Sequence, residues 1–351
     1  MKFRFDFEKL SGKKIYLYGA GSLAEDIVLL LRKRDIDIQA AVVDNAFFEQ
    51  DRYLLNDIPI VRFDDINSDD PFIIAANSNY KRIKSECDKK KIKVCFFPRI
   101  AYGGIEKVVS GLDFSVSSAE RSQLYDLIAD EESRDNLNIF SEILESGDVS
   151  KLLCVDVDDY FSNDIFVLRE DEVYLDIGSY NGDTIIDFLN ACEGSYRKVI
   201  AVEANKTNAE KTRQVIDRVR GENSILLYED VLWDREMKIR FGREEMSCEE
   251  ECTVGYGEFR ETKTLDGYME QWDKITFIKI NFPGANKVLR GGKKIIKRDL
   301  PTIACVVGFS KEDMLDVPAF LKSISSNYNI YLRWRLPLLD GLVLYATVRD
   351  V

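Results

Sequence analysis

The stretch VYLDIGSYNGDTIIDFLNAC, residues 173–192, decides the fold of the C-terminal half. Residues 173–177 are mostly apolar and predict a buried strand, and a helix with apolar residues at helical spacing begins at Asp183. The glycine-rich turn between them contains Gly178, Ser179, Tyr180 and Gly182. A strand, a glycine turn and a helix in this order predict the first unit of a doubly wound α/β sheet, with a ligand against the turn.

Two more strands follow, and each ends in an acid. KVIAVEA, residues 198–204, carries Glu203, which lies 21 positions after Gly182. SILLYED, residues 224–230, ends in Glu229 and Asp230. A carboxylate at the end of the second strand can accept both ribose hydroxyls of a nucleoside. A nicotinamide dinucleotide site begins in the same way and is the alternative interpretation of this half.

This acid-x-Gly-x-x-x-Gly turn with its two later acids resembles that of class I methyltransferases, and residues 120–350 resemble the FkbM family. The resemblance rests on LYDLIADEESRD, DDYFSNDIFVLREDEVYLDIGSYNGDTIIDF, TLDGYM, ITFIKINFPGANKVLRGGKKIIK, EDMLDVPAFLKSI and YNIYLRWR. It implies a doubly wound seven-stranded sheet, S-adenosylmethionine as cofactor, and O-methylation of a sugar or another small hydroxylated metabolite. It also implies that the cofactor is bound by Asp176, Gly178, Ser179, Tyr180, Gly182, Asp183, Glu203 and Asp230.

The chain departs from the family on the acceptor side. Family members usually read Lys-Met-Asp-Ile-Glu-Gly-Ala-Glu where this chain has KINFPGAN, residues 279–286. Three carboxylates are thereby replaced by Asn281, Pro283 and Asn286. Two sites where the family often has histidine carry Gly308-Phe309 and Arg333-Trp334-Arg335 instead. The order of NFPG also differs from the Asn-Pro-Pro-aromatic turn of amino-group methyltransferases.

Two functions follow from these departures. The first is an active methyltransferase with an altered acceptor pocket, whose acceptor-side candidates are Lys279, Asn281 and Asp313. The second is a catalytically silent protein of the same fold that binds cofactor or a sugar ligand as a scaffold. An amide such as that of Asn281 cannot take a proton from a hydroxyl, and the chain contains 0 histidines. Any general base must therefore be Asp, Glu, Tyr, Lys or Cys.

The N-terminal part contains a second glycine turn. KIYLYG, residues 14–19, predicts a strand, and Gly19-Ala20-Gly21 leads into a helix. A later strand ends near Asp44, 25 positions after Gly19, where an acid can bind a ribose hydroxyl. Residues 13–100 resemble the nucleotide-sugar-binding domain of bacterial sugar O-acyltransferases, on GAGSLAEDI, VVDN and IIAANSNYKR. The resemblance implies a Rossmann-like module with Gly19, Gly21 and Asp44 at a nucleotide-sugar, and a tight turn without a ligand is the alternative.

Three parts are predicted: a Rossmann-like domain over 1–103, a helical connector over 104–160 and the methyltransferase domain over 161–351. SSAERSQLYDL to FSEILESGDV, within 117–149, predicts two acidic amphipathic helices for the connector. The length of 351 residues suits two domains of ordinary size.

Composition predicts a globular protein of the cytoplasm, and the family resemblance implies a small-molecule substrate, a sugar or nucleotide-sugar. The net charge of −13, from 49 basic and 62 acidic residues, disfavours nucleic acid as a partner. No apolar run is long enough for a signal peptide or a membrane span, and the 7 cysteines suggest reduced thiols. We expect no metal site, with Cys248 and Cys252 on a surface loop, and the chain can form a homo-oligomer.

Overall fold

The structure is a computed structural model. It describes residues 10, 12–67, 70–75, 80–95, 116–146, 151–152, 155–161, 164–219, 224–242, 257–308, 310–336 and 339–349. Phe309, Cys248 and Cys252 lie outside these residues. The described chain forms two compact units. The first contains the residues up to 95 and those within 142–157, with Leu336, and the second contains those within 116–141, 158–335 and 339–349.

The first unit is a small α/β sheet with six strands in the order β3-β4-β2-β1-β5-β6. All neighbours are parallel except β3, which pairs antiparallel with β4. Its elements are β1 (Ile15–Tyr18), α1 (Ser22–Arg32), β2 (Ile38–Val43), β3 (Tyr53–Leu54), β4 (Ile58–Arg62), β5 (Phe72–Ile74), α2 (Tyr80–Lys89) and β6 (Val94–Cys95). Ile15, Leu17 and Val28 lie in its core. The predicted smaller α/β domain is confirmed.

The second unit is built on a seven-stranded sheet in the order β15-β16-β14-β13-β7-β8-β9. Its strands are β7 (Val173–Ile177), β8 (Lys198–Val202), β9 (Ser224–Tyr228), β13 (Phe277–Ile280), β14 (Thr302–Val306), β15 (Asn329–Trp334) and β16 (Leu342–Thr347). Only β16 runs antiparallel to its neighbours. The predicted seven-stranded sheet is therefore confirmed.

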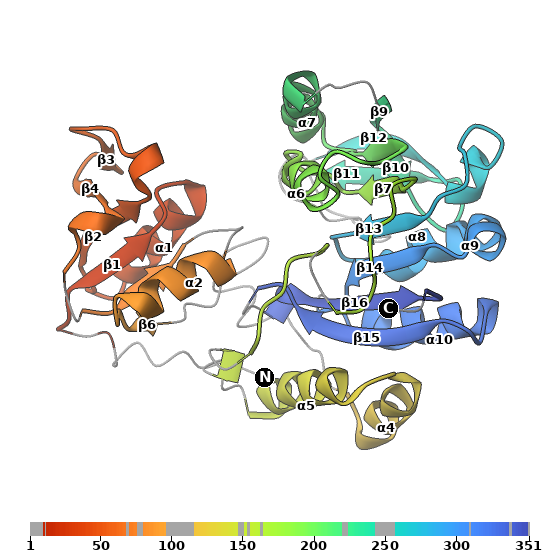
Figure 1. Cartoon of the computed structure of the whole chain (residues 1–351), viewed down its shortest axis with the longest axis horizontal. Coiled ribbons are helices and arrows are strands. Elements are labelled where there is room, and N and C mark those ends of the chain that lie inside the picture. The colour runs from red at the N-terminus through yellow and green to blue at the C-terminus, as the bar shows by residue number, and fades with distance from the viewer. Residues whose placement is uncertain are drawn as a thin grey trace. The chain divides into compact units, whose positions relative to one another are not determined.

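Helices cover both faces of this sheet, as a doubly wound fold requires. In Figure 1, α6 and α7 lie on one side of the sheet and α8, α9 and α10 on the other. The helices are α4 (Ser118–Leu127), α5 (Glu131–Ser146), α6 (Asp183–Ala191), α7 (Lys206–Val219), α8 (Ala285–Gly291), α9 (Lys293–Asp299) and α10 (Lys311–Ile324). Every residue of β7, β13 and β14 is buried, which explains why these parallel strands read as apolar runs.

A second, three-stranded sheet follows β9, in the order β10-β12-β11. Its strands are β10 (Val231–Leu232), β11 (Lys238–Gly242) and β12 (Gly257–Lys263). β12 leads directly into a 3-10 turn at Leu265–Tyr268. These elements lie between the third and fourth strands of the large sheet in the chain order and contribute residues to the site described below.

A buried arginine ties the start of α5 to the edge strand β15. Arg333 is 1% exposed, and its guanidinium pairs with Asp130 at 2.6 Å, Asp164 at 3.1 Å and Glu132 at 3.2 Å. The next residue, Trp334, is fully buried and lies 6.1 Å from the ring of Phe140. Trp334 thus packs the core and does not present an aromatic face to a ligand. Burial of Arg333 and Trp334 fixes the direction in which the chain leaves β15.

Among the described residues, no helix combines the length and the apolar character needed to cross a membrane. The predicted domain boundaries at residues 103 and 160 stay predictions.

Candidate functional site

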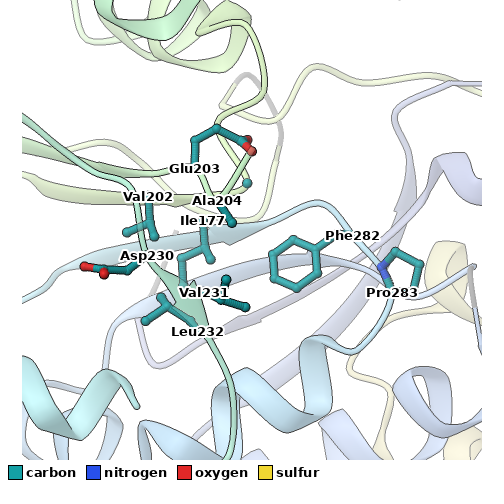
Figure 2. A pocket seen from close by; sticks show the side chains of 10 residues that line it. Ile177, Val202, Glu203, Ala204, Asp230, Val231, Leu232, Phe282 and Pro283 are labelled. Atoms are coloured by element: carbon teal, nitrogen blue, oxygen red, sulfur yellow. The ribbon is translucent and has the colours of Figure 1, made fainter. Parts of the chain in front are cut away.

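A pocket lies at the carboxyl ends of the central strands of the second unit. The empty space between its lining atoms, counted together with the adjoining open solvent, is about 500 Å³. Its lining comes from β7, β8, β10 and the turns that follow β7, β8, β9 and β13, and consists of Ile177, Gly178, Val202, Glu203, Ala204, Asp230, Val231, Leu232, Phe282 and Pro283. Figure 2 shows the Phe282 ring pointing into the pocket, with Glu203 and Asp230 on other sides of it. The carboxyl end of an open parallel sheet is where ligands bind in such folds.

Glu203 joins the glycine turn to the end of β8. It is 6% exposed, and its two oxygens accept hydrogen bonds from the backbone N–H groups of Tyr180 and Asn205, each at 2.8 Å. Burial raises the pKa of Glu203, although these two hydrogen bonds oppose the shift. Each carboxylate oxygen has two lone pairs, so each can accept one more donor from the pocket.

Asp230 lines the pocket, whereas its neighbour Glu229 does not. The Asp230 carboxylate accepts from the hydroxyl of Tyr268 and lies 3.0 Å from the Lys263 ammonium. The Tyr268 ring stacks on Trp272 with centroids 4.3 Å apart. Burial and the hydrogen bond to Asp230 raise the pKa of Tyr268. Asp230 is therefore held in place by Lys263, the last residue of β12, and by Tyr268 in the turn that follows this strand.

Arg260, on β12, holds the two backbone turns beside the pocket. Its guanidinium donates to the carbonyl oxygen of Ala204 at 3.0 Å and to that of Glu229. The sequence pattern did not identify Arg260, Lys263 or Tyr268, because nothing in the chain order shows that β12 returns to the ends of β8 and β9.

Asp176 is fully enclosed. It is 0% exposed, and its oxygens accept from the Lys279 ammonium at 2.9 Å and from the Thr184 hydroxyl at 2.6 Å. Lys279 is 1% exposed and also donates to the carbonyl oxygen of Gly178 at 3.1 Å. The sequence pattern did not predict this pair, although a lysine within the apolar strand TFIKIN could have indicated it, since a buried cation needs a partner. Both side chains are committed to joining β7, β13 and α6.

The glycine turn keeps its backbone shape through Gly178 and Gly182, with φ of +74° and +82°. A Cβ atom on Gly178 would lie 2.9 Å from a ring carbon of Phe282, so the ring packs directly against this glycine. Ser179 is buried with its hydroxyl 3.4 Å from that of Thr212. Tyr180 is 43% exposed, and Asp183 begins α6 beside the turn.

The acceptor-side candidates are dispersed. Asp313 is 0% exposed and accepts hydrogen bonds from the backbone N–H groups of Gly284 at 2.8 Å and Asn286 at 2.9 Å. Burial raises the pKa of Asp313 against these hydrogen bonds. Asn281 is half-buried and does not line the pocket, unlike Phe282 and Pro283 beside it. Asp313 thus holds the turn after β13, and Lys279 belongs to the buried pair with Asp176.

In the first unit, the surroundings of Gly19 leave no room for a side chain, whereas those of Gly21 do. A Cβ on Gly19, at φ +126°, would lie 2.4 Å from the carbonyl oxygen of Ala75, so the neighbouring strand accounts for this glycine without a ligand. A Cβ on Gly21 would have no atom within 4 Å.

Asp44 accepts hydrogen bonds from the Tyr18 hydroxyl and from Arg82 at 2.6 Å. Burial alone would raise the pKa of Asp44, but these bonds outweigh it and lower the pKa. A nucleotide-sugar at this turn stays a prediction. The described residues contain no group of His, Cys, Asp and Glu side chains arranged to hold a metal ion.

No protein-family model matches the sequence, and no curated protein sequence matches it. Among solved structures, the chain is similar to the methyltransferase FkbM from Methylobacillus flagellatus KT, with a TM-score of 0.59 and 16% identity. That likeness covers 97% of this chain and 92% of the other. The second unit has the class I methyltransferase fold.

Weaker likenesses exist to fibrillarin from Aeropyrum pernix with bound S-adenosyl-L-methionine and to an rRNA methylase from Streptococcus thermophilus. The fibrillarin has a TM-score of 0.32 and 11% identity, with 52% of this chain and 70% of the other covered. The rRNA methylase has a TM-score of 0.33 and 16% identity, with 52% and 90% covered. Neither is similar enough to support an inference.

Proposed function

We propose that the chain is an S-adenosylmethionine-dependent methyltransferase that methylates a hydroxyl group of a sugar or another small hydroxylated metabolite. The observation that carries the proposal is the pocket between Gly178, Glu203 and Asp230, at the cofactor position of a class I methyltransferase fold. The FkbM-like segments of the sequence support the choice of acceptor class.

The pocket has the chemistry that an adenosine group requires. Its walls include the apolar side chains of Ala204, Leu232 and Phe282, which suit a flat base. Glu203 can accept hydrogen bonds from both ribose hydroxyls, because each of its oxygens accepts only one backbone N–H and has a second lone pair available. Asp230 can accept from the amino group of the base in the same way.

In methyl transfer the protein forms no covalent bond with the substrate. The bound cofactor supplies an electrophilic methyl group, and the chain contributes position and the exclusion of water. No histidine is available, and Asn281, Pro283 and Asn286 stand where the family carries acids. We therefore expect most of the rate to come from alignment of the acceptor hydroxyl.

Calorimetric titration with S-adenosylmethionine and S-adenosylhomocysteine tests the proposal. Glu203→Ala removes the acceptor of two hydrogen bonds to ribose, each worth about 1.5–3 kcal/mol, so Kd should rise about a hundredfold or more. The exposed Glu236 provides the matched control, because Glu236→Ala removes an acid outside the pocket lining. Unchanged affinity in Glu203→Ala would refute the ribose contact.

Glu203 also holds the backbone of Tyr180, so a ligand-side control is needed. Saturation-transfer NMR with adenosine and with 2′,3′-dideoxyadenosine provides it. The wild-type protein should bind adenosine more tightly, and Glu203→Ala should bind both equally. Loss of both ligands to the same degree would indicate a disturbed turn instead of a lost ribose contact.

A catalytically silent, cofactor-binding protein is the second candidate. Two observations favour it: the acids of the acceptor side are absent, and the pocket lining does not extend to Asn281. A transfer assay with labelled S-adenosylmethionine and a panel of nucleotide-sugars separates the two functions. Turnover of any acceptor supports the enzyme, and tight cofactor binding without turnover supports the silent protein.

A further inference from the structure

Arg335 is a largely buried cation whose guanidinium makes no hydrogen bond with the residues that the structure describes. It follows β15, and its side chain is 12% exposed. The guanidinium lies over the Tyr160 ring, 4.3 Å from the centroid, and its nearest carboxylate oxygen, on Asp187, is 3.8 Å away. Within the described part of the chain, its guanidinium has this ring contact and this distant carboxylate but no side-chain hydrogen bond. A guanidinium carries five N–H donors, and leaving them unsatisfied when buried is unfavourable. The arrangement therefore suits an anionic ligand group.

Carboxylates surround this cation without binding it closely. Asp183 and Asp187 lie one turn apart on α6, so both occupy the same face of the helix. Asp159 and Lys279 are the other charged groups whose fields reach Asp187. Burial raises the pKa of Asp187 to about 6, against the influence of Arg335. The cluster thus presents one cation, from the residue after β15, and two acids from α6.

The cluster connects to the glycine turn through direct contacts. The Lys279 ammonium lies 5.9 Å from the Tyr160 ring centroid and donates to the carbonyl oxygen of Gly178. Thr184, the second residue of α6, donates to Asp176. The cation, its aromatic partner and the start of α6 are therefore neighbours of the turn that forms one wall of the adenosine pocket.

We propose that Arg335, Asp183 and Asp187 form the subsite for the α-amino acid end of the cofactor, with Arg335 binding its carboxylate and the two acids its ammonium group. The inference rests on the proposed function. It gives binding residues to the amino acid end of the cofactor, whereas the pocket residues contact its base and ribose. Asp176 cannot supply this contact, because it is enclosed by Lys279 and Thr184.

The charges select this ligand class over other anions. A phosphate would meet the repulsion of both acids on α6, whereas a zwitterion satisfies Arg335 and the acids together. The carboxylate of the cofactor's amino acid end would also accept charge-assisted hydrogen bonds from the Arg335 guanidinium, which the described residues do not provide.

The test compares S-adenosylhomocysteine with 5′-methylthioadenosine, which has the same nucleoside but no amino acid end, by calorimetry on the full chain. Wild-type protein should prefer S-adenosylhomocysteine. Arg335→Met should weaken its binding about 10- to 100-fold and leave 5′-methylthioadenosine unchanged. Arg290 is the matched control: its guanidinium lies over the Phe320 ring at 5.4 Å and pairs with Asp316 at 3.6 Å. Arg290→Met should leave the preference intact.

Asp187→Asn is the second variant, because loss of Arg335 from the Tyr160 ring can also disturb folding. It should reduce the preference for S-adenosylhomocysteine as well, with thermal unfolding confirming the native fold. A preference unchanged in both variants, or an equal loss of both ligands, overturns the subsite. If neither ligand binds the wild-type protein, the proposed function fails instead.

Discussion

Replacement of Lys279 by Met should destabilise the second unit strongly. Lys279 and Asp176 are 1% and 0% exposed, with their charged atoms 2.9 Å apart. Removing one partner of a buried ion pair leaves an uncompensated charge and typically costs about 3–5 kcal/mol. In Lys279→Met, the hydroxyl of Thr184 would be the one hydrogen-bond donor that the described residues leave to the Asp176 carboxylate. For a unit of this size, the melting temperature should fall by roughly 6–20 °C.

Tryptophan fluorescence provides a selective assay, because all 3 tryptophans, Trp233, Trp272 and Trp334, lie in the second unit. Urea unfolding followed by this signal should show the loss in Lys279→Met. The double variant Asp176→Asn with Lys279→Met should recover much of it, since replacing a whole buried pair is often close to neutral. A loss below about 1 kcal/mol in the single variant would refute a buried, charged pair.

Three further variants test the charges around the site by the same fluorescence-detected urea unfolding. The pKa of Asp187 is about 6 in the folded protein and about 3.9 in an unfolded chain, so the folded state binds more protons between these values. Stability should therefore fall as pH rises from about 4 to 6, and Asp187→Asn should flatten this dependence; an unchanged slope would exclude Asp187 as its source. Asn286→Glu should destabilise more than Pro283→Glu, because position 286 is buried beside the Asp313 carboxylate and Pro283 lines the pocket. Equal urea midpoints for these two variants would contradict this reasoning.

The strands of the large sheet could be predicted because their residues alternate little and are buried on both faces. TFIKIN predicted β13 (Phe277–Ile280), and TIACVV predicted β14 (Thr302–Val306). The acids at the ends of β8 and β9 could be placed for the same reason, since parallel strands end at one edge. Glu203 and Asp230 indeed line one pocket.

The partners of these acids could not be predicted, because they depend on contacts between distant segments. Asp230 meets Tyr268 and Lys263 only because β12 pairs with β10. Arg335 reaches Asp187 across 148 positions of sequence, and no local pattern marks such a pair. Periodicity reports which face of an element is buried, not which side chain lies opposite it.

The acids retained on the cofactor side and the acceptor side do not by themselves distinguish an active enzyme from a silent one. Asp176 holds Lys279, Glu203 holds two backbone N–H groups, and Asp313 holds the turn after β13. Folding alone would explain why each acid is retained, since each accepts hydrogen bonds from buried donors that would otherwise lack a partner. What favours a ligand is unused hydrogen-bonding capacity. Glu203 and Asp230, which line the pocket, keep free lone pairs, and the guanidinium of Arg335 makes no hydrogen bond with the described residues. Affinity for the whole cofactor and for its parts is therefore the measurement that separates folding roles from binding roles.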